Sequence, residues 1–184
     1  MNWSKVRADG EASLRRLENV HRAAPGEQEE YLRRETHLQL LEAALHTADH
    51  SAARRHLDAW WSLRTPLGEQ PRIQDRFQEL KDQMLRIQVL FRSGDIADAR
   101  ALIAEVWPEV EAVYRAAPNE RFNRIQHASA LWVRAEVDGT LDRAARRALL
   151  TRAAEILRPL AGEGKLTRRD RDWVLAGVER DLAR

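Results

Sequence analysis

Histidine and carboxylate side chains, the residue types that bind metal ions, gather in one short stretch of the chain. His46 and His50 are four residues apart with Asp49 between them, and His56 follows closely. On one continuous helix, side chains at this spacing share a face, as a zinc site needs. The pattern instead predicts a turn at Ala48-Asp49, which breaks that geometry. We therefore predict no metal site and no cofactor here, and expect these histidines to be exposed near the turn.

Other potential catalytic groups occur singly or at helix ends. Glu18 and His21 have the spacing of a di-iron ligand pair, but that site needs two such pairs and the chain has one. The sequence contains no nucleophile elbow, phosphate loop or dinucleotide-binding glycine motif, and no cysteine. We therefore predict that the protein is not an enzyme. Paired carboxylates are present and are interpreted as solvated helix ends and starts: Glu29 with Glu30, and Asp170 with Asp172.

The composition fits a helical domain that would position any such groups. The chain has 184 residues, 43% of them hydrophobic and 33% charged, enough to bury a core in a single domain over residues 1–184. No stretch approaches the roughly 18 apolar residues of a membrane span. The opening residues MNWSKVRADGEAS lack the apolar centre of a signal peptide. We therefore expect a cytoplasmic protein.

Apolar residues recur at helical spacing along nearly the whole chain, without a convincing alternating strand pattern. Breaks are predicted at Pro25-Gly26 and in the TPLGEQP stretch of residues 65–71, and a bend is predicted near Pro108. Thr167, with Asp170 three residues on, is predicted to cap the last helix. The predicted helices cover a first segment through Leu14, Leu17 and Val20, then residues 27–47, 51–63, 72–92, 96–115, 121–137, 141–160 and 169–182.

Three similar stretches precede alternate helices and indicate an internal repeat. They are TADHSAAR (47–54), SGDIADAR (93–100) and DGTLDRAAR (138–146), with a step of 46 between successive copies, although the third also matches at 45. Within SGDIADAR, Gly94 is predicted to allow a turn, Asp95 to cap the next helix and Ala99 to let two helices approach. Apolar positions keep the same step: Leu45, Phe91 and Val137; Leu41, Ile87 and Val133; Leu57, Ile103 and Leu149.

The series Gly94-Asp95-Ile96, Ala99, Ile103 and Val106 resembles the turn and second helix of a tetratricopeptide repeat. The resemblance implies an all-α, right-handed superhelix of about three helix-turn-helix repeats, here with an atypical period of about 46. The repeats would cover residues 27–66, 70–117 and 119–161, between an N-terminal capping helix and a terminal cap at 167–184. A second stretch, residues 24–45, resembles part of the accessory domain called uroporphyrinogen-III C-methyltransferase-like, found on bacterial membrane-anchored proteins.

Tryptophan and arginine residues are the predicted binding residues of such a repeat groove. Trp60 and Trp61 point about 100° apart on a helix, so both cannot face one core stripe. A groove lined with Trp and Arg would suit a protein or peptide partner or a second copy of the chain. The alternative is nucleic-acid or anion binding through the segment from Arg143 onward, which contains ten arginines and Lys165 but only six acidic residues. The predicted binding residues are Trp60, Trp61, Trp107, Trp132, Arg54 and Arg100.

Overall fold

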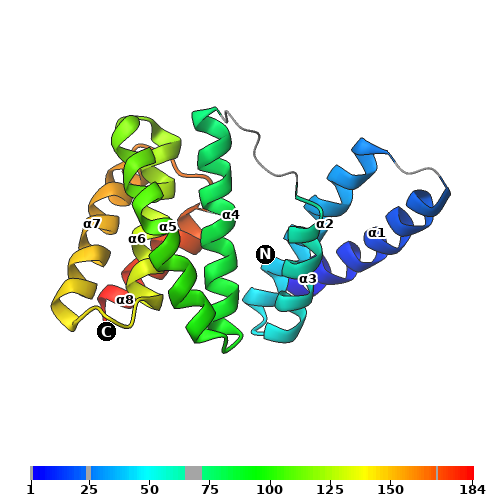
Figure 1. The fold of residues 1–184 in the computed structure, drawn as a ribbon, viewed down its shortest axis with the longest axis horizontal. Coiled ribbons are helices and arrows are strands. Elements are labelled where there is room, and N and C mark those ends of the chain that lie inside the picture. The colour runs from blue at the N-terminus through cyan, green and yellow to red at the C-terminus, as the bar shows by residue number, and fades with distance from the viewer. Residues whose placement is uncertain (1, 24–25, 65–71, 169) are drawn as a thin grey trace. The chain divides into compact units, whose positions relative to one another are not determined.

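The computed structural model of the chain describes residues 2–23, 26–64, 72–168 and 170–184. These residues form eight α-helices and one π-helical turn, with no strand among them (Figure 1). The predicted all-α class is confirmed. The breaks predicted at Pro25 and at residues 65–71, and the helix start predicted at Arg169, lie outside the described residues. The helices are α1 (Trp3–Ala23), α2 (Glu27–His46), α3 (His50–Ser62), α4 (Ile73–Arg92), α5 (Ile96–Ala116), α6 (Arg121–Val137), α7 (Arg143–Gly162), η1 (Asp170–Leu175) and α8 (Ala176–Leu182).

The chain divides into two compact units. The N-terminal unit consists of Met1–Pro66 with Arg92–Gly94, and the C-terminal unit of Leu67–Phe91 with Asp95–Arg184. The single domain predicted over residues 1–184 stays a prediction, because a division into compact units does not decide whether they fold independently. No helix in the described ranges combines the length and apolar character needed to cross a membrane.

In the N-terminal unit, α2 packs against both α1 and α3. Gly10 of α1 lies so close to α2 that a Cβ on it would be 2.9 Å from the Leu40 side chain. Arg7 of α1 forms an ion pair with Asp49 at the α2–α3 joint, with Nη1 2.8 Å from Oδ2. The Trp3 and His46 rings stack with centroids 3.8 Å apart. Close backbone approach and ring stacking therefore fix α1 on the α2–α3 hairpin.

The first two predicted joints share one backbone geometry. Ala48 and Gly94 are both left-handed, with φ of 54° and 94°. In each joint the following N–H, of Asp49 or Asp95, donates to the carbonyl five residues earlier at 2.9 Å. This bond and the left-handed residue together make the Schellman ending of a helix. The turn predicted at Gly94 is confirmed, and positions 46 apart in the sequence adopt the same conformation.

The third joint is built differently. Asp138 is extended, and its Oδ1 accepts hydrogen bonds from the N–H and hydroxyl of Thr140 at 3.0 and 2.6 Å. Asp142 then caps α7 through its side chain, as Asp49 caps α3. The capping role predicted for Asp95 is wrong: it occupies the N-cap position but makes no side-chain cap hydrogen bond. The ambiguity of the third copy in sequence thus corresponds to a real change of turn.

Helix α6 is the centre of the C-terminal unit because both of its sides are buried. Val133 and Val137 face a cluster built by α4 and α5, which also contains Ala99. Leu131 and Ala135 face a second cluster built with α7 and the C-terminal segment. Ala99 is fully buried, as expected for a helix-contact position. Figure 1 shows α4 to α8 side by side in this unit.

The terminal segment differs from the single α-helix predicted for it, because Asp170–Leu175 is π-helical. The cap predicted at Thr167 is confirmed, since its hydroxyl oxygen accepts from the N–H of Asp170 at 3.1 Å. Gly177 then meets the indole of Trp132 so closely that a Cβ would clash with the ring. A π turn uses more residues per turn than an α-helix, so a search at the α-helical period does not reveal it.

Candidate functional site

The histidines considered as metal ligands are held in separate contacts. His46 stacks on Trp3, and Asp49 caps α3. His56 was predicted to be exposed near the turn; it is instead half-buried, with its Nδ1 3.1 Å from Nδ1 of the buried His37. Across the described ranges, no group of three or more His, Cys, Asp or Glu residues is placed to hold a metal ion.

The carboxylate Glu29 was predicted to be a solvated first-turn acid, and this is wrong. Its side chain is 9% exposed and its Oε2 lies 2.8 Å from His21 Nδ1. His21, considered above as a partner of Glu18, therefore bonds from α1 to α2. The physical reason is tertiary: the antiparallel packing of α1 on α2 brings these two side chains together. The other pair behaves as predicted at a helix start, because Asp170 accepts from the N–H and hydroxyl of Thr167 and Asp172 is an exposed partner of Arg168.

In the N-terminal unit, the two successive tryptophans have different environments, as predicted. Trp60 is 1% exposed and Trp61 is half-buried, with their rings 5.9 Å apart at an interplanar angle of 61°. The guanidinium of Arg64 lies 4.2 Å from the Trp61 ring centroid. Arg54 forms an i,i+4 ion pair with Asp58 at 3.2 Å. The face of Trp61 is thus already partnered by a cation within the same helix end.

In the C-terminal unit, two predicted binding residues make contacts that hold the fold. Trp132 is 2% exposed and donates from Nε1 to Asp181 at 2.8 Å. Arg100 donates from Nε to the carbonyl of Val137 at 3.2 Å and lies over the third joint. Trp107 is half-buried and touches both core clusters. The binding role of all six residues stays a prediction, and Trp132 is the most enclosed of those in this unit.

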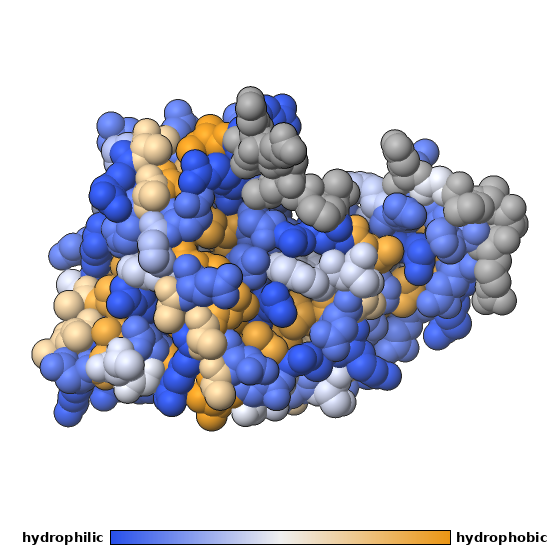
Figure 2. Space-filling view, in the orientation of Figure 1, coloured by the Kyte–Doolittle hydropathy of each residue, from blue (hydrophilic) through white to orange (hydrophobic). Residues whose placement is uncertain are grey.

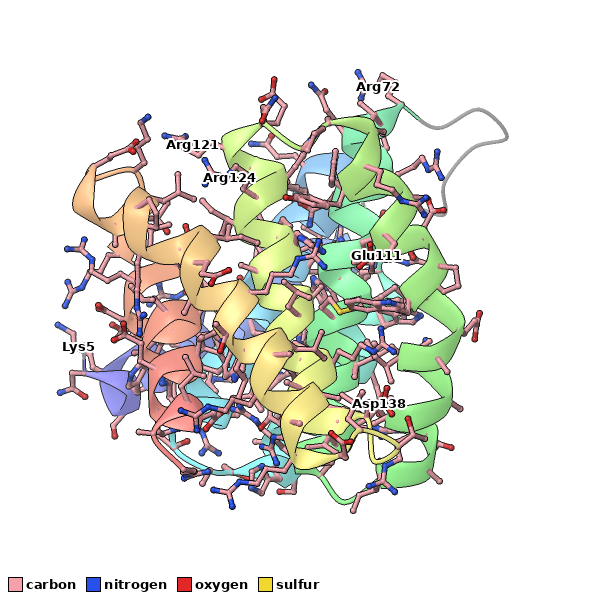
Figure 3. All side chains as sticks on the ribbon, turned by 90° about the vertical axis from the view of Figure 1, so that its left-hand side faces the viewer. Lys5, Arg72, Glu111, Arg121, Arg124 and Asp138 are labelled. Carbon is pink, nitrogen blue, oxygen red and sulfur yellow. The ribbon has the colours of Figure 1, made fainter. Side chains whose placement is uncertain are left out.

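Trp107 belongs to a row of aromatic and charged contacts between α5 and α6, here called the α5–α6 seam: Trp107, Glu111, Tyr114, His127 and Arg134. Arg134 covers the Trp107 ring at 4.3 Å from its centroid. His127 stacks on Tyr114 with centroids 3.7 Å apart and an interplanar angle of 17°. Glu111 lies between these stacks, with Oε1 3.6 Å from His127 Nε2. Figure 3 shows Glu111 midway along the helices, with Arg121 and Arg124 toward one end of the unit and Asp138 toward the other.

His127 is the most unusual residue of the seam. It is 2% exposed, and neither ring nitrogen has a hydrogen-bond partner. Burial and the nearby Arg152 lower the pKa of His127 to about 4, against the opposing effect of Glu111. The ring is therefore neutral at pH 7 and offers one donor and one acceptor. The nearest carboxylate oxygen, Glu111 Oε1, lies 3.6 Å from Nε2, slightly beyond hydrogen-bond distance.

A small pocket opens beside the seam, between α4, α5 and α6. Its volume is about 20 Å³, room for a single water molecule or the tip of a side chain. Figure 2 shows hydrophobic surface over α4 to α6 between hydrophilic residues. The apolar part of the lining consists of Phe77, Leu80, Met84, Val110, Val113 and Ala130. The polar part consists of Lys81, Tyr114, Asn123, Gln126 and His127.

Sequence reasoning found Trp107 but missed the rest of the seam and pocket. The available signal was helical spacing: Trp107, Glu111 and Tyr114 lie four and three residues apart on one side of a helix. On the next helix, His127 and Arg134 are seven residues apart in a stretch that is otherwise apolar except for Ser129. Polar residues that interrupt an apolar stripe at helical spacing would have marked both sides.

Comparison of the chain with protein-family models, with curated proteins and with solved structures finds no match. Function is therefore argued from the geometry of the seam and the pocket.

Proposed function

We propose that the protein is a non-catalytic interaction module that binds a segment of another protein. In this proposal the helix hairpins of residues 27–66, 70–117 and 119–161 form a tetratricopeptide-like, right-handed solenoid, with α1 and the 167–184 segment as caps. The shared geometry of the Ala48 and Gly94 joints supports a common repeat unit. The proposed location is the cytoplasm, and the resemblance of residues 24–45 to the methyltransferase-like accessory domain remains a secondary hypothesis.

The observation that carries the proposal is the seam beside the pocket. Tryptophan, tyrosine and arginine, the residue types most enriched among interface hot spots, occur together there on half-buried positions. The pocket adds an apolar floor with polar groups at its edge. At protein interfaces, the residues that dominate binding fill well-packed pockets, and the tip of such a side chain could enter this one. The unsatisfied His127 is most simply understood if a bound segment provides a partner.

The state of His127 also supports binding rather than turnover. A general base works best when its pKa is near the working pH. The pKa of His127 is lowered to about 4, far below neutral pH. His127, whose pKa is shifted by its surroundings in the seam, is thus poorly suited to exchange protons with a substrate.

Ion pairs weigh against the nucleic-acid alternative as first framed. Several arginines of the C-terminal half are neutralised by acids, and Trp132 and Asp181 add to this network. These pairs reduce the basic character of the chain end, where a nucleic-acid backbone would require extended unpaired charge. The paired arginines are Arg134 with Asp138, Arg158 with Glu179, Arg168 with Asp172, and Arg180 and Arg184 with Asp181.

Site-specific photo-crosslinking would test the proposal. A photoreactive amino acid is placed at Gln126, on the pocket edge, or at Ala112, an exposed position facing the other side of α5. Irradiation in native lysate followed by mass spectrometry should give one dominant protein adduct from position 126 and none of it from position 112. A peptide with the crosslinked segment is then titrated against the purified chain. Equal adducts from the two positions, or no binding of that peptide, would contradict the proposal.

His127→Phe separates binding from folding in the same titration. Phenylalanine keeps the aromatic stack on Tyr114 and removes both unpaired nitrogens. We expect unchanged or greater stability to urea, since an unsatisfied buried group is lost. Peptide affinity should fall about tenfold, the effect of losing roughly one good hydrogen bond. Unchanged affinity would show that the partner makes no hydrogen bond with His127.

A further inference from the structure

The arginines of the C-terminal unit differ in whether an acid neutralises them. Most of those near the chain end pair with an acid, as described above. Arg143, Arg146 and Arg147 are exposed and, within the described ranges, none of their side chains makes an ion pair or hydrogen bond. These three side chains, here called the α7 arginine triad, are therefore available to an external partner.

The triad is held on one side of α7. Spacings of three and four residues place the three side chains on neighbouring positions of one helix face. The same side continues along α7 as Leu150 and Leu157, which are buried in the core. The face of α7 that packs against the rest of the unit is therefore apolar and buried along the helix, but at the N-terminal end of α7 it is exposed and consists of the three guanidinium groups.

Among the described residues, no ion pair compensates the charge of the triad. The first turn of α7 contains no acidic residue. The carboxylate of Asp142 is engaged with the N–H of Ala145 at 2.7 Å, and that of Asp138 with Thr140 and Arg134. Cations at a helix N-terminus oppose the helix dipole. The arrangement favours an anionic partner because such a partner would relieve both the mutual repulsion and the opposition to the dipole.

We infer that the α7 arginine triad docks an acidic stretch of a protein segment, through carboxylates. This inference rests on the proposed function and names the chemistry of the partner. Arginine forms bidentate bonds with carboxylates, so three guanidinium groups within about one turn and a half match a short acidic run. A nucleic acid is less favoured, because its evenly spaced phosphates require basic groups over a longer distance, and Arg158, Arg168 and Arg180 further along pair with acids.

The test compares two charge-matched triple variants of the full chain. One variant is Arg143→Gln/Arg146→Gln/Arg147→Gln, which removes the unpaired arginines. The control is Arg158→Gln/Arg168→Gln/Arg180→Gln, which removes the same formal charge from paired positions. Binding of a fluorescein-labelled deca-glutamate peptide and of a labelled DNA duplex is measured by anisotropy at low ionic strength, where screening is weak.

We expect deca-glutamate affinity to fall about tenfold or more in the α7 variant and less than about threefold in the control, as charge-assisted arginine–carboxylate bonds are lost only in the former. Equal losses would overturn the inference, since binding would then follow net charge alone. The inference would also be overturned if the unaltered chain did not bind the deca-glutamate peptide. The same holds if the unaltered chain bound the DNA duplex more tightly than the peptide and the α7 variant lost that duplex binding. The α7 variant leaves Gln126 and His127 in place, so failure here with the position-126 adduct intact would leave the proposed function standing.

Discussion

The clearest stability prediction concerns His37, which lies where α2 meets α3. Its ring is 8% exposed and contacts His56 through a 3.1 Å hydrogen bond between the two Nδ1 atoms. Burial, then the charges of His56 and Arg33, lower the pKa of His37 to about 4. On the facing elements, Arg55 of α3 adds positive charge near the pair, and Glu11 of α1 opposes it. Protonation of His37 is therefore disfavoured in the folded chain.

The sign and size of the effect follow from the two pKa values. The folded value of about 4 lies below the unfolded value of 6.5, so this group favours folding at neutral pH. That contribution is full above pH 6.5 and is lost as the pH falls toward 4. The complete loss would be about 3 kcal/mol, at 1.36 kcal/mol for each pKa unit. At pH 5 the loss should be about 2 kcal/mol, because the unfolded ring is then almost fully protonated.

Urea unfolding of the unaltered chain and of His37→Gln, at pH 7.5 and 5.0, measures the contribution of His37 to the pH dependence of the unfolding free energy. Glutamine retains a donor and an acceptor for His56 and does not titrate. The fall in unfolding free energy between the two pH values should be smaller in the variant by about 2 kcal/mol. Hydrogen exchange of amides in α2 and α3 shows whether the change is local to the N-terminal unit. If both proteins lose the same free energy to within about 0.5 kcal/mol, the burial argument for His37 is refuted.

Three backbone positions give further predictions. Ala48→Gly should raise the unfolding free energy by about 0.5–1 kcal/mol in urea titrations, because glycine relieves the left-handed conformation at φ 54°. Gly177→Ala should lower it by about 1–3 kcal/mol, since the new Cβ would clash with the rigid, buried ring of Trp132. In Gly139→Ala the new Cβ would lie equally close to the Arg100 side chain, but the unfolding free energy should fall by less than about 1 kcal/mol, because the flexible end of Arg100 can move away. Equal costs for the two alanine variants would show that neighbour rigidity does not decide the outcome.

Most of the helices could be predicted from the periodicity of apolar residues in the sequence. The apolar positions Leu41, Ile87 and Val133, 46 residues apart, are all fully buried. The turn at Gly94 was also predictable, because glycine is the residue that adopts a left-handed ending without strain. Ala48 takes the same conformation with a Cβ, so its turn was predictable only from its position in the repeat.

The seam was largely hidden because its contacts join residues far apart in the sequence. Tyr114 and His127 are 13 positions apart, and nothing in either helix alone specifies that their rings stack. The pairing of His21 with Glu29 was missed for the same reason: a first-turn acid is normally solvated, and only the packing of α1 on α2 buries it. Local propensity describes one helix at a time, whereas these contacts depend on how two helices are set against each other.

The contrast between satisfied and unsatisfied polar groups gives the strongest reason to look for function in the C-terminal unit. The buried indole of Trp132 has its carboxylate partner in Asp181, as expected where selection acts on stability. A few positions away on the same helix, His127 has neither of its hydrogen bonds, and the arginine triad repels itself at the start of α7. Other buried side chains of the described residues, Gln88 among them, also have a polar atom without a partner, so the exposed arginine triad is the feature that a partner can most directly complete.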